Sequence, residues 1–256
     1  MRDYEVNKIM QGSPPPQKYQ VSLENWRKYP HCKWSFSNVR DLIPTAIISE
    51  NRNKKVNFKK NLVDLNSLTI NHKGMRSNLL SVLEKCDTDA FLVMQKGILK
   101  YEFFDNFTKE NTPHIIFSLS KSITSLLTGI LVSQKVINLD SPVSTIIEET
   151  KGSAYEHATV RNVLDMNIAS RFVEDYTGNE QIFKDYRAST GWDIPKQTKE
   201  LNFLGLHDFL SKLPTSDLEH GRKYHYCSPH SDLLGWIIER ASGKKYSKIM
   251  SELFLP

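Results

Sequence analysis

Apolar residues recur at helical spacing in several separate stretches of the chain. In "SKSITSLLTGILVS", residues 120–133, five apolar positions share one broad face, which predicts a helix that begins near Ser118. They are Ile123, Leu126, Leu127, Ile130 and Leu131. A second amphipathic stretch follows Ser231, a candidate N-cap, and ends just before Gly243. Shorter helical patterns occur at 75–86, 159–166, 206–213 and 246–255, and Thr159 is a candidate N-cap for the second of them.

Strand patterns are concentrated in one part of the chain. In "DAFLVMQKGILKYEFF", residues 89–104, two runs rich in β-forming residues flank Lys96 and Gly97. This arrangement predicts a β-hairpin with the Lys-Gly pair as its turn. Together with the helical stretches, the hairpin predicts a fold of the α+β class.

Residues 170–203 lack a clear period but are rich in aromatic side chains: Phe172, Tyr176, Phe183, Tyr186 and Trp192. A long irregular segment inside a compact chain is often a binding loop. We therefore expect this segment to contact a ligand.

Composition narrows the class of protein. The 256 residues have a net charge of +5 from 34 basic and 29 acidic side chains. The densest basic run, Arg52 to Lys60, comes with no nucleic-acid motif, so we predict a solvated loop or strand edge and no nucleic-acid partner. No stretch of about 18 residues is apolar and uncharged, and "MRDYEVNKIM" does not read as a secretory signal. We expect neither a membrane span nor export.

The three cysteines, Cys32, Cys86 and Cys227, lie far apart and fit neither a zinc site nor a disulfide framework. We expect them to be small buried side chains in a reducing cytoplasm, and we expect no metal and no cofactor.

Ser118 and Lys121 form the first candidate for chemistry. Residues three apart share a helix face, so these side chains would stand together in the first helical turn. The free N–H groups there can stabilise an oxyanion, and the helix dipole disfavours a charged lysine. A neutral Lys121 could then take the proton of Ser118 and activate it for acyl transfer.

The same spacing also arises by chance. Ser242 and Lys245 repeat it at the end of a predicted helix, where the N–H groups are already used. Spacing alone therefore leaves open whether Ser118 is a nucleophile or only a residue of a helix start.

"YHYCSPHSDLLGW" supplies a second element, with Tyr226 and Ser228 just before the helix at 231–242. A phenol beside a lysine can relay protons. The alternative is that Tyr224 and Tyr226 only pack their rings along a strand. His225 and His230 are also near, but we interpret them as structural.

Taken together, these elements resemble the penicillin-recognising serine hydrolases: class C β-lactamases, related esterases and D,D-peptidases. There a Tyr-x-Asn or Tyr-x-Ser motif follows Ser-x-x-Lys, as Tyr226-Cys227-Ser228 does here. Within this superfamily the chain most resembles the nylon-oligomer (6-aminohexanoate-dimer) hydrolases. "WRKYPHCKWSFSNVRDLIPTAIIS", "VLDMNIASRFVEDYTG" and "DYRASTGW" carry that likeness nearly end to end.

The resemblance implies a role for each of several positions. Ser118 would be the acylated nucleophile, Lys121 its proton acceptor and Tyr226 the group that passes a proton to the leaving group. Tyr176 would bond the scissile amide, and Trp192 would cover the substrate. Ser228 would be a further substrate-binding residue. Packing of Tyr176 and Trp192 within the loop is the alternative.

The resemblance also implies an architecture: a β-lactamase/transpeptidase-like antiparallel sheet flanked by helices, with an inserted, mainly helical domain. We expect residues 1–147 to form the first part of the α/β domain, with the hairpin and the nucleophile helix. Residues 148–256 would form the helical domain with the substrate loop and the tyrosine motif. The family's third motif, Lys-Thr-Gly or a variant on a later strand, does not occur after Tyr226. We therefore expect the C-terminal part of the sheet domain to be absent.

Three functions remain as hypotheses. The first is a cytoplasmic serine hydrolase of linear amides or carboxylic esters. The second is a truncated, non-catalytic relic of the fold that serves as a binding module. The third, a D,D-peptidase, fits least because its substrate lies outside the cytoplasm. A homodimer or a complementing C-terminal half would be the partner chain.

Overall fold

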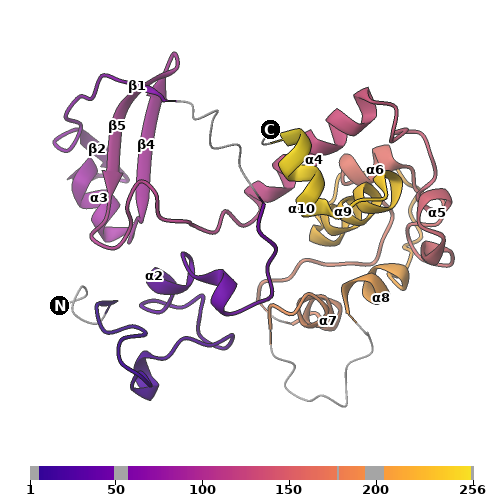
Figure 1. Ribbon diagram of the computed structural model, residues 1–256, viewed down its shortest axis with the longest axis horizontal. Helices are drawn as coiled ribbons and strands as arrows, with labels where there is room; N and C mark the ends of the chain where they lie inside the picture. Colours follow the sequence, from indigo (N-terminus) through magenta and orange to yellow (C-terminus); the bar gives the residue numbers. More distant parts are fainter. Residues whose placement is uncertain (1–5, 49–56, 178, 194–204, 255–256) are drawn as a thin grey trace. The chain divides into compact units, whose positions relative to one another are not determined.

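The computed structural model describes residues 6–48, 57–177, 179–193 and 205–254 (Figure 1). These residues divide into two compact units: 6–42 with 57–115, and 43–48 with 116–254. None of the helices in these ranges has both the length and the apolar character needed to cross a membrane.

The first unit contains the strands. They are β1 (Lys59–Lys60), β2 (Thr69–His72), β3 (Met75–Asn78), β4 (Ala90–Gln95) and β5 (Ile98–Phe104). Its helical elements are α2 (Cys32–Ser35), α3 (Leu79–Lys85) and two 3₁₀ turns, Gln17–Tyr19 and Val39–Asp41.

The predicted hairpin is confirmed. Strands β4 and β5 pair antiparallel, with Gln95 opposite Ile98 at the turn. Lys96 and Gly97 have φ values of 50° and 74°, as the two central residues of a type I′ turn require. Strand β1 pairs parallel to β5, so β5 is central and β4 is paired on one side only among the described strands.

The basic run is confirmed in part as a strand edge. Its last two residues, Lys59 and Lys60, form the exposed strand β1, and Lys60 Nζ donates to Glu102 at 2.9 Å. Its other residues, from Arg52 to Lys55, lie outside the described residues.

One predicted helix begins too early. The pattern at 75–86 predicted a continuous helix, but residues Met75–Asn78 form β3, which pairs antiparallel with β2. Helix α3 begins only at Leu79, because the Asn78 side chain accepts a hydrogen bond from Ser81 N at 2.8 Å and caps it. Leu79 and Leu83 then turn inward against Tyr101 of β5.

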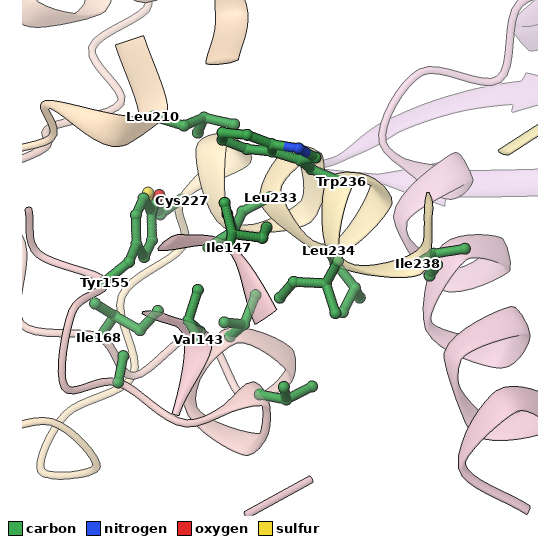
Figure 2. Packing of buried hydrophobic residues seen from close by; sticks show 14 of the residues in the cluster. Val143, Ile147, Tyr155, Ile168, Leu210, Cys227, Leu233, Leu234, Trp236 and Ile238 are labelled. Carbon is green, nitrogen blue, oxygen red and sulfur yellow. The ribbon is translucent and has the colours of Figure 1, made fainter. Parts of the chain in front are cut away.

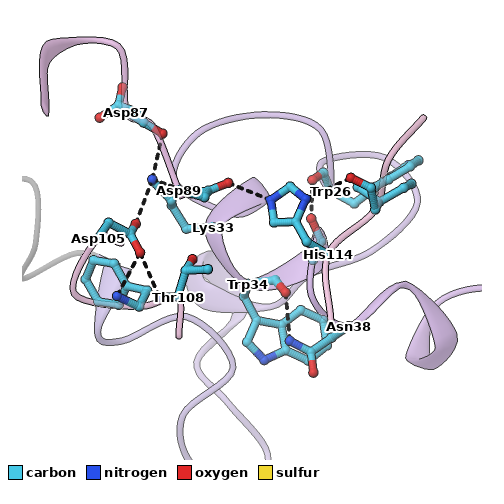
Figure 3. Close-up of polar contacts among 12 residues, drawn as sticks. Trp26, Lys33, Trp34, Asn38, Asp87, Asp89, Asp105, Thr108 and His114 are labelled. Atoms are coloured by element: carbon cyan, nitrogen blue, oxygen red, sulfur yellow. Dashed lines mark hydrogen bonds and ion pairs between the residues drawn. The ribbon is translucent and has the colours of Figure 1, made fainter. Parts of the chain in front are cut away.

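A buried lysine ties α2 to the ends of the hairpin (Figure 3). Lys33 Nζ donates to Asp89 at 2.5 Å, to Asp105 at 2.9 Å and to the carbonyl of Asp87 at 2.7 Å. His114 Nε2 approaches the other oxygen of Asp89 at 2.8 Å. Burial alone would lower the pKa of Lys33, but the hydrogen bonds to Asp89 and Asp105 outweigh it and raise that pKa.

The second unit is helical. Its elements are α4 (Leu119–Ser133), α5 (Val143–Ile146), a 3₁₀ turn (Glu148–Thr150), α6 (Val160–Leu164), α7 (Gln181–Ser189), α8 (Leu206–Ser211), α9 (Ser228–Ser242), α10 (Tyr246–Ile249) and a π-helical segment (Met250–Phe254).

Helix α9 lies at the centre of this unit's core. Leu233, Leu234 and Ile237 on α9 are almost fully buried, and Val143 and Ile147 reach them from the α5 segment (Figure 2). Helix α4 adds Leu127 and Leu131 to the same cluster. The predicted apolar face of α4 is only partly inward, since Leu126 is 60% exposed.

Several local predictions in this unit are confirmed. Thr159 caps α6 as predicted, through a capping box with Asn162. Gly243 ends α9 in the left-handed conformation with a φ of 68°.

Helix α9 begins earlier than predicted, at Ser228 and not after Ser231. Pro229 lies in its first turn, where a missing N–H costs nothing. Helix α7 was not predicted at all, because it is short and mostly polar; the burial of Phe183 and Tyr186 holds it in place.

Side-chain burial only partly follows the expectation for the cysteines. Cys227 is fully buried, whereas Cys32 is half-buried and Cys86, at the end of α3, is exposed. The boundary between the units also differs from the expected one after residue 147. Helix α4 clusters with the helical unit, because its buried leucines pack in the core around α9.

Candidate active site

Ser118 stands at the start of α4. It is the N-cap residue, it is exposed, and its side chain does not cap the helix. Its backbone N–H has no hydrogen-bond partner in the described parts of the chain. The preceding residue, Phe117, has a φ of 42°, an unfavourable value for a bulky side chain. Such backbone strain is often found at functional sites.

Two side chains converge on the Ser118 hydroxyl. Lys121 Nζ donates to Ser118 Oγ at 3.0 Å, from the first turn of the same helix. Tyr226 OH donates to the same oxygen at 2.8 Å, from the segment that leads into α9. Lys121 Nζ also lies 5.4 Å from the centre of the Tyr226 ring. The three predicted catalytic side chains therefore form one hydrogen-bonded group.

The second Ser-x-x-Lys match has no such surroundings. Ser242 is the last residue of α9, and its hydroxyl donates to the carbonyl of Ile238 at 2.7 Å. The carbonyl end of a helix offers no N–H groups to an oxyanion. Position in the helix thus separates the two matches.

Ser228 is held by a carboxylate. Its hydroxyl donates to Glu174 Oε1 at 2.8 Å, and its backbone N–H donates to Glu174 Oε2 at 2.8 Å. The Ser228 side chain is buried, with only 9% of the residue exposed. Ser228, the last residue of the tyrosine motif, thus directs both its donors at Glu174.

Tyr176 is on the loop between α6 and α7. Its ring is 72% exposed and packs edge-on against Phe183, 5.2 Å away. Its hydroxyl donates to Glu174 Oε1, the oxygen that also accepts from Ser228. Burial of the phenol group and the neighbouring Glu174 carboxylate raise the pKa of Tyr176. The phenol therefore stays protonated, and its one proton is donated to Glu174.

Asp175 shapes the same loop. Its carboxylate accepts hydrogen bonds from Thr177 and from the backbone N–H groups of Asn179 and Glu180. These bonds lower the pKa of Asp175 to about 2, and the hydrogen bond from the Thr177 hydroxyl has the largest effect. The turn that follows Tyr176 is thereby fixed by an ionised side chain.

Trp192, which follows the end of α7, lies near Phe117. Its ring lies 6.3 Å from that of Phe117, the residue before Ser118. The final stretch of the predicted loop, from residue 194, falls outside the described residues. All six predicted site residues thus belong to the second unit.

The two nearby histidines have structural contacts. His225 Nε2 lies 2.8 Å from the carbonyl of Phe172, and His230 Nδ1 lies 3.1 Å from the Tyr155 hydroxyl. His230 is fully buried, and burial lowers its pKa to about 3. Neither ring contacts Ser118, in agreement with our interpretation of both as structural.

Two acidic residues near the site were not predicted from the sequence. Glu174 joins Tyr176 to Ser228, and Asp232 accepts a 2.5 Å hydrogen bond from Tyr186. Burial raises the pKa of Asp232. No spacing rule links Glu174 to a partner 54 residues away, so only the fold reveals this contact.

Comparisons with known proteins show the family and the fold of this chain. A family model described as Beta-lactamase matches residues 105–256, more than half of the chain. The 6-aminohexanoate-dimer hydrolase of Paenarthrobacter ureafaciens is 29% identical over 230 residues. That match covers 90% of this chain and 56% of the relative, so the chain spans about half the length of the curated protein.

A solved structure shares the fold. The "Putative 6-aminohexanoate-dimer hydrolase from Bacillus anthracis" superposes with a TM-score of 0.84 at 23% identity. The superposition covers 94% of this chain and 62% of that one. At this identity the likeness concerns the fold, and it confirms the predicted α+β, β-lactamase/transpeptidase-like class. On the family match and this shared fold, the chain belongs to the Beta-lactamase family.

Proposed function

We propose that this chain carries the acylation site of a serine hydrolase that cleaves linear amides or carboxylic esters. The observation that carries the proposal is the position of Ser118 Oγ, 3.0 Å from Lys121 Nζ and 2.8 Å from Tyr226 OH. A serine hydroxyl is a weak nucleophile, and an adjacent base is the usual means of activating it.

Each group has a step in the proposed reaction. Lys121, as the neutral amine, takes the proton from Ser118 Oγ while that oxygen attacks the substrate carbonyl. The N–H of Ser118 faces the oxyanion that forms. Tyr226 passes a proton to the leaving amine or alcohol and receives in its place the proton that Lys121 took from Ser118, and an acyl-enzyme ester remains on Ser118. Water then releases the acid and restores the hydroxyl.

The substrate class rests on the surroundings of this group. Tyr176, on the loop between α6 and α7, and Trp192, after the end of α7, supply aromatic surface, and Glu174 holds the Tyr176 hydroxyl. The related protein from Paenarthrobacter ureafaciens is named for the hydrolysis of a linear amide. We therefore propose that a small linear amide or ester binds along Tyr176 and Trp192, with Ser228 supporting the tyrosine segment. The proposed setting is the cytoplasm, with no nucleic-acid partner.

The test is a pre-steady-state burst with p-nitrophenyl acetate. The proposal predicts a rapid release of about one equivalent of p-nitrophenol per chain and an acetyl group on the acid-quenched protein. Ser118→Ala should abolish both, and Ser242→Ala, in the second Ser-x-x-Lys match, should keep both. If well-folded protein shows no burst and no acetyl group, the proposal fails and a non-catalytic binding module becomes the better account.

A further inference from the structure

One carboxylate, that of Glu174, joins two segments of the proposed site. Its Oε1 accepts from the hydroxyls of Tyr176 and Ser228, and its Oε2 accepts from the backbone N–H of Ser228. Tyr176 is on the loop between α6 and α7, whereas Ser228 is the first residue of α9. Both donors of Ser228 therefore end on a residue from another part of the unit.

The position of this carboxylate is electrostatically favourable. The start of a helix has free N–H groups and the positive end of the helix dipole, so an anion there is stabilised. Pro229 has no N–H, which makes the N–H of Ser228 an important donor at this end. Hydrogen bonds to an ionised acceptor are about twice as strong as neutral ones. Glu174 is thus suited to holding the first turn of α9.

The first turn of α9 in turn positions the tyrosine motif. Tyr226, whose hydroxyl contacts Ser118 Oγ, is two residues before Ser228. Cys227 between them is fully buried, which limits the freedom of this short segment. A shift of Ser228 would therefore move Tyr226 relative to Ser118, and the loss of Glu174 would also release the Tyr176 hydroxyl.

We propose that Glu174 is a positioning residue of the Ser118 site: its carboxylate holds Tyr176 and the first turn of α9, and through that turn Tyr226, in the arrangement needed for acylation. The assignment of a role in acylation rests on the proposed function. The hydrogen-bonded link itself does not, and it can be measured without any reaction.

Three variants separate the possible roles of the carboxylate. Glu174→Ala removes every acceptor. Glu174→Gln keeps the size: its amide oxygen can still accept from the Ser228 N–H, while its NH₂ group faces the two hydroxyls, which must rotate to accept. Glu180→Gln is the control, because Glu180 lies exposed in the same loop and does not cap α7 with its side chain.

The first measurement is hydrogen exchange of the Ser228 amide, followed by NMR. We expect exchange to become roughly tenfold faster or more in Glu174→Ala, and to change little in Glu174→Gln and in Glu180→Gln. Unchanged exchange in Glu174→Ala would overturn the proposed link. This result does not depend on whether Ser118 reacts.

The second measurement is the rate of Ser118 labelling by a fluorophosphonate at several probe concentrations. We expect the efficiency of labelling to fall roughly tenfold or more in Glu174→Ala, with partial rescue in Glu174→Gln, since a lost buried partner commonly has an effect of this size. In the Tyr176→Phe background the Glu174→Gln change should have a smaller effect than in the wild type, because the Tyr176 contact is already absent and only the Ser228 hydroxyl is still affected. Wild-type labelling rates in Glu174→Ala would overturn the positioning role.

The two measurements distinguish a failure of the proposed function from a failure of the positioning role of Glu174. If the wild-type chain is not labelled at Ser118, the proposed function fails, and the exchange experiment alone decides the Glu174 link. If the wild-type chain is labelled but Glu174→Ala loses stability to the same extent as activity, with no rescue by glutamine, the positioning role is contradicted while the proposed function stands.

Discussion

Tyr226 OH lies 2.8 Å from Ser118 Oγ, although 108 residues separate them in the chain. The contact joins the start of α4 to the segment before α9, two elements of the same helical core. The contact places a second proton-carrying group beside the Ser118 hydroxyl, and the Ser-x-x-Lys spacing alone does not predict this group.

Removal of the Tyr226 hydroxyl should slow acylation without disturbing the fold. We expect Tyr226→Phe to reduce the fluorophosphonate labelling rate on the order of 10²-fold, because the ring remains and only the proton relay is lost. Tyr224→Phe is the matched control, since that ring is 64% exposed. Equal rates in the two variants would contradict a role for Tyr226.

The two Ser-x-x-Lys matches allow a similar comparison for the lysine. Lys121→Met should reduce labelling at least on the order of 10²-fold, because Ser118 loses its proton acceptor. Lys245→Met changes the lysine of the second match, which lies beyond the end of α9, and should leave the rate unchanged. The measurement is the pseudo-first-order labelling rate at one probe concentration. A large loss in both variants would contradict the assignment to Lys121.

His230 should make the protein sensitive to acid. Burial lowers its pKa in the folded chain to about 3, below the ordinary value of 6.5 for an unfolded histidine. Between these two pH values the unfolded chain binds more protons than the folded chain. The free energy of unfolding therefore falls as the pH decreases from about 6.5 to about 3, by up to ~1.4 kcal/mol per pH unit.

The check is the free energy of unfolding measured by urea denaturation across this range of pH. His230→Asn keeps a polar group near Tyr155 but does not titrate, so the acid loss of stability should become smaller. His157→Asn, at an exposed position, should retain the full loss. The same pH dependence in both variants would exclude His230 as its source.

The buried Lys33 should stabilise the first unit. Lys33→Met leaves the Asp89 and Asp105 carboxylates together without their cation, and we expect a loss of about 3 kcal/mol. Lys60→Met removes a more exposed pair with Glu102 and should cost much less. Hydrogen exchange of the backbone amides in β4 and β5 would measure the unfolding of this unit. A loss of similar size in both variants would contradict a special role for Lys33.

Local signals account for the parts that the sequence predicts well. The Lys96-Gly97 turn, the Thr159 cap and Gly243 are each determined by neighbouring residues, so their patterns are visible in the sequence. Helix α7 and the early start of α9 depend on distant partners. Phe183 and Tyr186 are fixed by tertiary packing, and Ser228 is held by Glu174 from 54 residues away.

In the candidate site, too, contacts between neighbouring residues are predictable from the sequence and contacts between distant residues are not. Ser118 and Lys121 share one helical turn, so their contact follows from spacing, and the resemblance to a family added Tyr226, Tyr176 and Trp192. Glu174 had no pattern to reveal it, because an acidic residue in a loop ordinarily faces water. Its partners became visible only when the loop and α9 were brought together.

Ser118 is the proposed nucleophile of this site. The most direct measurement is mass spectrometry of the protein after reaction with a fluorophosphonate, followed by mapping of the modified peptide. We expect a single adduct on the peptide that contains Ser118, absent in Ser118→Ala and retained in Ser242→Ala. Folded wild-type protein without an adduct, or with its adduct on another residue, would contradict this assignment.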